Sequence, residues 1–323
     1  MKPLMPRNQV RNLVDERLRL PPFPDAAREL HVLLQDPKAG TREAAEALER
    51  APAVGARLLQ LANAGYMKLA TRLDSIAHMA DVLGVRTLHD LALQAALMEQ
   101  YAHLEGDSEF DIEGQWAHAI LTALVARGLA RRFHGPSGLR PSEAYVAGIL
   151  HDAGKLVLLD CLGDTYRDAQ REAGDRRRSL EAIEGQRFGF THVHVGARLV
   201  ERWNLPRQVV RAICFHHGPS FEIVNNPAVL IVALADQIAY RCSNALGGTV
   251  RSRLQSLAAR VLHLTPEAFG EVLVEAQKHR ALVTADLRLA RSGALSVPSA
   301  GKNGGGSDRD FPDPAERTKT QVP

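Results

Sequence analysis

Apolar residues recur at helical spacing over most of the chain, from about residue 24 to residue 288. Runs in which apolar and polar residues alternate between hairpin turns, as in β-strands, are scarce. The pattern therefore predicts an all-α fold. Short helices with short connections, and no repeat at a fixed period, favour a compact bundle over a solenoid.

Helix start signals follow one another closely in the N-terminal part of the chain. Asp25 suits the first turn of a helix that ends near Asp36. Thr41 is placed to cap the next helix. Ser75 precedes a short helix, and the segment 86–101, RTLHDLALQAALMEQY, predicts a longer one. These signals predict a small helical subdomain.

The pattern also divides the chain into segments. From about residue 293 the sequence is rich in Gly, Ser, Pro and charge and cannot bury a core. A second set of amphipathic helices begins near Glu105. The predicted segments are an N-terminal extension at 1–13, an N-terminal helical subdomain at 14–104, a second helical domain at 105–290 and a disordered tail at 291–323.

Composition is that of a soluble globular protein, with 323 residues, 45% of them hydrophobic and 24% charged. The 40 basic and 37 acidic residues nearly cancel, so the chain lacks the charge of a dedicated nucleic-acid binder. Its 3 cysteines fit neither a disulfide framework nor a zinc ribbon, which indicates a reducing, cytoplasmic setting. The most apolar run, 227–240, is too short to span a membrane and carries Asp236. We therefore expect no membrane partner.

One apolar, helix-like segment is interrupted by polar residues. In AGILHDAGKLVLL, residues 147–159, the interruptions are His151, Asp152 and Lys155. A charged side chain in a buried helix is costly unless it is paired or binds a metal. The segment therefore faces a polar cavity or holds an ion.

Similar interruptions occur in four successive helical segments. The residues concerned are His118, His151, Asp152, His192, His216, His217 and Asp236. Each alone could be a hydrogen-bonded core residue, but together they form an imidazole and carboxylate set suited to Fe, Mn or Zn. The set predicts a single divalent ion or a pair of ions, with a metal-free polar core as the alternative.

Asp152 and Lys155 are the candidate catalytic residues within this set. His151 and Asp152 point in different directions, so Asp152 could bridge two ions while His151 binds one of them. Such ions would lower the pKa of a bridging water and polarise a phosphoryl oxygen. Lys155 lies one turn beyond His151 and could contact a phosphate or pair with Asp152.

Several separated motifs carry a family resemblance. In order they are LPPFPDAARELHVLLQDP, LLQLANAGYM, LGVRTLHDLAL, WAHA, AGILHDAGKLVLL, FGFTHVHVGARLVERWNLP and FHH. From about residue 14 to residue 240 the chain resembles the HDOD domain, the HD-related output domain of bacterial signalling proteins. The resemblance implies an N-terminal helical subdomain packed on an HD-phosphohydrolase-like helical core.

The resemblance also implies ligand positions. The metal ligands of the wider HD superfamily lie at positions that match His118, His151 with Asp152, and Asp236 in this sequence. The similar HD-GYP proteins, which hydrolyse cyclic di-GMP, have further ligands at positions that match His192 and His216 with His217. The chain departs from HD-GYP where GPSFEIVNNP replaces the Gly-Tyr-Pro signature. Gly114 stands where some relatives carry a Glu ligand, and His194 stands where Glu is common. We expect His194 at most to support a ligand.

The sequence is compatible with three functions. The favoured one is a regulatory protein of signal transduction that binds a partner protein or a nucleotide without catalysis. The second is a metal-dependent phosphohydrolase or phosphodiesterase with His118, His151, Asp152 and Asp236 as its minimal ligand set. The third is DNA binding by the helices of residues 41–64, which offer only Arg57 and Gln60 to bases, so nucleic acid is not expected.

Overall fold

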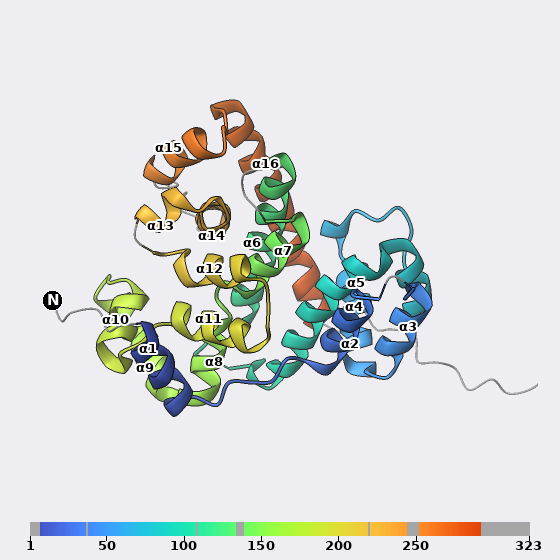
Figure 1. Cartoon of the computed structure of the whole chain (residues 1–323), viewed down its shortest axis with the longest axis horizontal. Helices are drawn as coiled ribbons and strands as arrows, with labels where there is room; N and C mark the ends of the chain where they lie inside the picture. Colours follow the sequence, from blue (N-terminus) through green and yellow to red (C-terminus); the bar gives the residue numbers. More distant parts are fainter. Residues whose placement is uncertain are drawn as a thin grey trace, which may run out of the picture.

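The computed structural model describes residues 7–36, 38–107, 109–133, 139–218, 220–243 and 252–291. Within these residues all the regular elements are helices, which confirms the predicted all-α fold (Figure 1). The predicted disordered tail lies outside the described residues, apart from residue 291.

A bundle near the N-terminus is built around one long helix. Its elements are α2 (Asp25–Leu33), α3 (Thr41–Glu49), α4 (Pro52–Ala62), η1 (Gly65–Met67), α5 (Ile76–Gln100) and η2 (Ala102–Leu104). Helices α2, α3 and α4 all pack against α5. The apolar stripe of each helix lies in the shared core, where Leu30, Leu48 and Leu58 are fully buried.

The helix starts in this bundle differ from the expected ones in detail. Helix α2 ends at Leu33, before the predicted Asp36. The cap of α3 is Gly40, and Thr41 is its first helical residue, whose hydroxyl donates instead to Asp81. Ser75 directly precedes α5, as expected, and is its N-cap, accepting from the backbone N–H of His78 at 3.1 Å.

Helix α5 joins a short and a longer helical stretch. Gly84 interrupts it with a φ of 73°, a left-handed value that glycine adopts without a side-chain clash. The short stretch predicted after Ser75 and the longer one predicted at 86–101 thus form one interrupted element.

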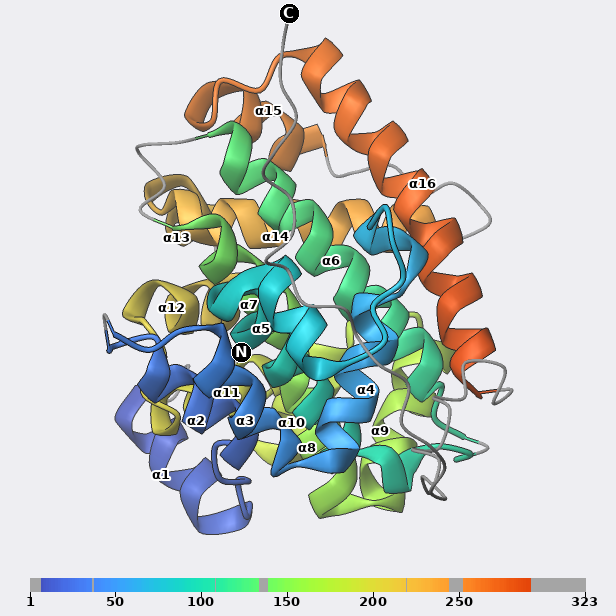
Figure 2. The same ribbon diagram turned by 90° about the vertical axis from the view of Figure 1, so that its right-hand side faces the viewer.

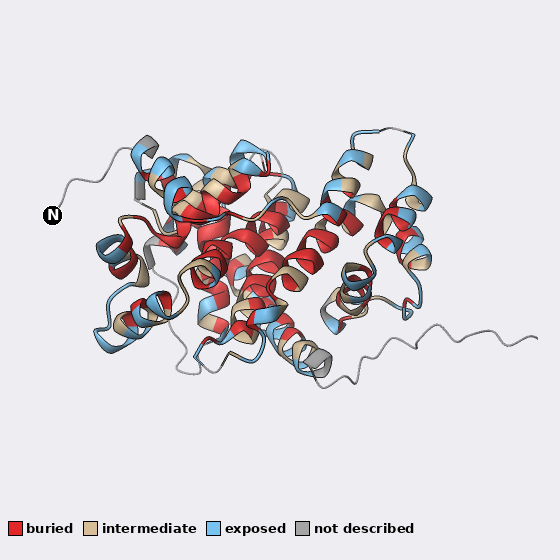
Figure 3. Cartoon of the chain, turned by 90° about the horizontal axis from the view of Figure 1, so that it is seen from below, coloured by how far each residue is buried: buried red, intermediate tan, exposed pale blue. Residues whose placement is uncertain are grey.

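The larger part of the chain packs around one long helix, Ile112–Arg132. Its elements are α6 (Ile112–Arg132), α7 (Pro141–Leu150), α8 (Ala153–Leu162), α9 (Asp164–Asp175), α10 (Leu180–Phe188), α11 (His192–Arg202), α12 (Arg207–Phe215), α13 (Ser220–Asn225), α14 (Pro227–Ser243), α15 (Ser252–Val261) and α16 (Pro266–Arg291). Helix α6 packs against α7, α14 and α16. Figure 3 shows the most buried ribbon in this central region.

Two helices connect distant parts of the chain. Helix α1 (Arg7–Arg17) packs on α11, and the chain then crosses to the α2–α5 bundle (Figure 1). Helix α16 runs along one side of the molecule and contacts η1, where the backbone N–H of Gly65 donates to Asp286 at 2.9 Å (Figure 2). The predicted domain boundaries remain a prediction.

Among the described residues, no helix combines the length and the hydropathy that crossing a bilayer requires.

Candidate metal centre

A break between two helices positions the His151–Asp152 doublet. The sequence pattern suggested one helix-like segment over 147–159, but α7 ends at Leu150 and α8 begins at Ala153. His151 is the C-cap of α7 and Asp152 is the N-cap of α8. The break lets two adjacent side chains reach the same centre, which they could not do from one continuous helix.

Two glycines beside the break allow other helices to come close. A Cβ on Gly148 would lie 2.4 Å from the Cα of Ala123 in α6. A Cβ on Gly154 would lie 2.0 Å from the carbonyl oxygen of His192 in α11. Both positions therefore require glycine, because any side chain would push α6 or α11 away and displace the histidines these helices carry.

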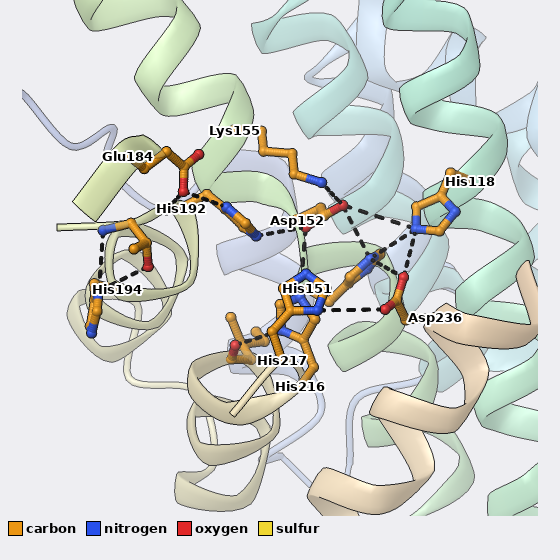
Figure 4. Close-up of polar contacts among 12 residues, drawn as sticks. His118, His151, Asp152, Lys155, Glu184, His192, His194, His216, His217 and Asp236 are labelled. Carbon is orange, nitrogen blue, oxygen red and sulfur yellow. Dashed lines mark hydrogen bonds and ion pairs between the residues drawn. The ribbon is translucent and has the colours of Figure 1, made fainter. Parts of the chain in front are cut away.

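One group of side chains surrounds the Oδ2 atom of Asp152 (Figure 4). The Nε2 atom of His118 lies 3.1 Å from Oδ1 of Asp236 and 3.2 Å from Nε2 of His151. Nε2 of His151 lies 3.4 Å from Oδ2 of Asp152. Lys155 donates to the same oxygen at 2.5 Å, so it takes the pairing role that the sequence left open.

A second group faces the other oxygen of the same carboxylate. Oδ1 of Asp152 lies 3.4 Å from Nε2 of His192 and 3.7 Å from Nε2 of His216. His217 places Nδ1 at 3.8 Å from Oδ2 of Asp236, which links the two groups. The structure thus brings the seven candidate ligands together in one centre, with Asp152 between the two groups, although their binding of an ion stays a prediction.

Hydrogen bonds to backbone carbonyl groups orient two of the imidazole rings. Nδ1 of His151 lies 2.7 Å from the carbonyl oxygen of Gly148, and Nδ1 of His216 lies 2.8 Å from that of Ile213. A carbonyl only accepts, so each Nδ1 carries the proton. The neutral ring then presents an Nε2 lone pair to the centre.

Glu184 orients His192 and was missed in the sequence analysis. Its Oε2 lies 2.7 Å from Nδ1 of His192 and accepts the backbone N–H of His192 at 2.9 Å. The hydroxyl of Tyr166 donates to Oε1 at 2.7 Å. The carboxylate is fully buried. In the sequence, Glu184 stands out only because it lies four positions before Phe188 and so on the buried side of α10.

Burial and local charge set the protonation states. Burial opposes the charged form of Asp152, but the ammonium group of Lys155 counters it and holds the pKa of Asp152 well below the usual value. Burial lowers the pKa of His192, against the pull of Glu184. Burial, with His216 close by, lowers the pKa of His217 to about 2. An ionised carboxylate beside neutral imidazoles is the state in which these groups bind metal.

Three buried atoms at the centre lack a hydrogen-bond partner among the described residues. They are Oδ1 of Asp152, Nε2 of His192 and Nε2 of His216. Each such atom costs about 1–3 kcal/mol unless something satisfies it. Ligand atoms about 2.1 Å from a tetrahedral ion lie about 3.4 Å apart, close to the separations given above. The donor set therefore fits a divalent ion of the Fe, Mn or Zn type.

Two other sequence candidates lie outside the centre. Nδ1 of His194 accepts the backbone N–H of Thr191 at 3.1 Å and so caps α11, the helix that begins at His192. The backbone N–H of Gly114 donates to Asp111 in the first turn of α6. His194 thus supports a candidate ligand through the helix cap, not by a contact with an ion.

The side chain proposed to read DNA is engaged inside the protein. Arg57 forms ion pairs with Glu99 at 2.8 Å and with Glu105 at 3.2 Å. A guanidinium held by two carboxylates offers little charge to a phosphate backbone. Of the two side chains proposed to contact DNA bases, only Gln60 is therefore left.

The sequence model of the HDOD domain matches residues 20–219. The chain belongs to the HDOD domain family. The HDOD match includes six of the seven candidate ligands, and Asp236 lies beyond its end.

Solved structures share the HDOD fold. A protein provisionally named for signal transduction, from Marinobacter aquaeolei VT8, is 24% identical with a TM-score of 0.71, over 90% of this chain and 68% of that one. A protein provisionally named a phosphohydrolase, from Shewanella amazonensis SB2B, is 24% identical with a TM-score of 0.66, over 86% of this chain and 97% of that one.

A relative found by sequence is an uncharacterized protein of Treponema pallidum (strain Nichols), which is 23% identical over 218 residues, 67% of this chain. This chain spans 41% of that relative's length.

Proposed function

We propose that this HDOD protein acts in signal transduction by binding a partner protein or a nucleotide, and that its His/Asp centre holds a divalent ion without catalysing a reaction. The signalling role is supported by membership of the HDOD family and by the name of the relative from Marinobacter aquaeolei VT8.

The observation that carries the proposal is the unequal pairing of the two Asp152 oxygens. Oδ2 accepts from Lys155 at 2.5 Å, whereas Oδ1 has no hydrogen-bond partner among the described residues. Two-metal hydrolysis needs a second cation on the same carboxylate, about 3.5–4 Å from the first. The ammonium group of Lys155 occupies the cationic position on Oδ2, so the arrangement favours one ion, on the Oδ1 side.

The residues that would hold this ion are Asp152, His192, His216 and His217, whose ligand atoms lie within 4.8 Å of one another. When bound, a divalent ion supplies positive charge and Lewis acidity. The protein's own residues keep Asp152 ionised through Lys155 and fix the ring of His192 through Glu184. A bound ion would thereby tie together α8, α11 and the end of α12.

A metal-dependent phosphohydrolase is the second candidate. It is favoured by the position of Asp152 between two groups of histidines, as a bridging ligand would be. Three residues of the centre also keep partly exposed side chains, namely His118, Lys155 and His217 at 16%, 19% and 26%. In this function Lys155 would leave Asp152 and contact a phosphate oxygen. The relative from Shewanella amazonensis SB2B carries a name of this kind.

Metal content and turnover together separate the two candidates. The protein is purified anaerobically without chelator, and its Fe, Mn and Zn contents are compared with those of Asp152→Asn. We expect about one ion per wild-type chain, almost none in the variant, and no hydrolysis of bis(p-nitrophenyl) phosphate by either.

Other outcomes decide against the proposal. About two ions per chain, with hydrolysis that Asp152→Asn abolishes, would establish the phosphohydrolase. A folded wild type that takes up none of the three metals, even when each is added at about 10 times the protein concentration, would contradict the metal site in both candidates.

A further inference from the structure

A cavity lies beside α11, which begins at the candidate ligand His192, and α12, which ends immediately before His216. It has a volume of about 890 Å³ and lies between α1, α11 and α12. That volume is in the range of small-molecule sites, about 300–1,000 Å³. None of the seven candidate metal ligands lines it. The cavity is therefore separate from the metal centre.

The lining of this cavity is rich in arginine. Four arginines line it, Arg11, Arg198, Arg207 and Arg211, against one acidic residue, Glu201. Some of this charge is neutralised at the rim. Arg198 pairs with Asp15 at 2.6 Å, Arg211 pairs with Glu222 at 2.7 Å, and Glu201 lies 3.0 Å from Nε of Arg11. The arginines remain in excess over these three carboxylates.

Arg207 supplies the free cationic group. It is exposed, and no ion pair or side-chain hydrogen bond joins it to another residue in the described part of the chain. Arg211 lies one turn further along the same helix, so both side chains lie on one side of α12. Guanidinium groups bind phosphate oxygens through paired N–H donors. Arg207 therefore forms a phosphate site together with Arg211, which contacts Glu222 through one amino group only.

The remaining lining suits a flat polar ring. Phe215, half-buried, and Val210 provide an apolar wall, and Asn204 and Gln208 provide amide donors and acceptors. Aromatic faces stack on bases, and side-chain amides can pair with base edges. A lining with an arginine end and an aromatic, amide-bearing end fits a nucleotide better than it fits an acidic peptide.

We propose that this cavity binds a nucleoside polyphosphate, with its phosphates on Arg207 and Arg211 and its base near Phe215. The site lies beyond the metal centre and does not depend on it. Helix α11 begins at His192, and α12 ends immediately before His216 and His217. A bound nucleotide therefore contacts one helix that carries a candidate ligand and one that leads directly to two others (Figure 1). The cavity would thus serve as the input site of a signalling protein.

Calorimetric titration of the full chain tests the proposal with ATP, GTP, tripolyphosphate and adenosine as probes. We expect at least one of the two nucleotides to bind with a Kd below about 0.1 mM, tripolyphosphate to bind more weakly, and adenosine to bind at least about 10-fold more weakly. Arg207→Glu should weaken nucleotide binding by at least about 10-fold. Arg260→Glu, a matched change at an exposed arginine in α15, should weaken it by less than about 2-fold.

Three results would overturn it. They are no binding of ATP, GTP or tripolyphosphate at about 1 mM, equal weakening by Arg207→Glu and Arg260→Glu, and equal binding of ATP and adenosine. The metal content of the same preparations is measured separately. Failure of the metal site, seen as an absence of bound ion, and failure of the nucleotide site, seen as an absence of binding that depends on Arg207, therefore give different results.

Discussion

The chain carries two adjacent His–Asp pairs in different surroundings, His89–Asp90 within α5 and His151–Asp152 between α7 and α8. At the first pair the helix continues, and Nδ1 of His89 lies 3.2 Å from Oδ1 of its own neighbour Asp90. At the second pair the helix breaks, and the two side chains meet residues from α6, α11 and α14 (Figure 4). An adjacent His–Asp pair is therefore not sufficient by itself to bring further candidate metal ligands together.

The residues three positions before and after each histidine explain the difference. Around His151 they are Gly148 and Gly154, where the backbones of α6 and α11 approach closely. Around His89 they are Arg86 and Ala92, so neither position is a glycine. A doublet becomes a polyhistidine centre where missing side chains let other helices bring their ligands within reach.

Asp152→Asn and Asp90→Asn make the sharpest contrast between the pairs. The first removes the charged oxygen shared by both ligand groups and should lower the affinity for Mn or Zn by at least about 1,000-fold. The second should leave the affinity within about 2-fold. The measurement is the rise in melting temperature on adding metal, which should occur in the wild type and Asp90→Asn alone. Equal loss of this rise in both variants would contradict the comparison.

Gly154→Ala tests the close approach of α8 and α11. A methyl group 2.0 Å from the carbonyl oxygen of His192 cannot be accommodated, so the helices must separate. We expect a loss of about 3 kcal/mol in the free energy of unfolding, measured in urea. Gly174→Ala is the control, because a Cβ there meets nothing within 4 Å, and it should be neutral or slightly stabilising. An unchanged stability in Gly154→Ala would refute the steric argument.

Glu184→Gln tests whether the buried carboxylate positions a ligand. The amide keeps the size of the side chain but removes the charge that fixes the ring of His192. Such supporting residues contribute about 10–100-fold in metal affinity, and a loss of that size is expected from competition with a chelator. Tyr166→Phe, which removes only the hydrogen bond to the other oxygen, should have a smaller effect. An affinity unchanged by Glu184→Gln would leave the glutamate without a positioning role.

The smallest expected effect concerns the histidine beside the first doublet. Burial, with His89 nearby, lowers the pKa of His31 below 6.5, and the two rings lie 5.4 Å apart. The unfolded chain therefore takes up this proton first, so stability is lost as the pH falls below about 6.5. His31→Gln should lose less stability than the wild type between about pH 7.5 and pH 5.5. The control is His263→Gln, at an exposed position without an ion pair among the described residues, and an identical pH profile for His31→Gln and the wild type would exclude the effect.

The fold and the ligand set were accessible from the sequence for clear reasons. Helical periodicity reports which face of each helix is buried, and the structure has only helices among its described elements. Histidines and aspartates inside apolar stripes must find polar partners, and the structure brings them together in one centre.

Other features depend on contacts that periodicity does not report. The break at His151, the backbone contacts of Gly148 and Gly154, and the pairing of Glu184 with His192 all involve neighbours distant in sequence. The cap formed by His194 was hidden for a different reason, because a histidine in a helix's first turn looks the same whether it faces an ion or the backbone.

Asp236 brings the order of folding into view. Its carboxylate meets His118 across 118 residues of chain, from a helix that begins only at Pro227. Contacts of such long sequence separation form late, since a long loop must close first. A nascent chain that has reached only His217 already contains six candidate ligands but not the carboxylate that joins the His118 and His217 sides. Completing α14 would therefore be the step that closes the His118 side of the centre, after all four residues proposed to hold the ion have been synthesised.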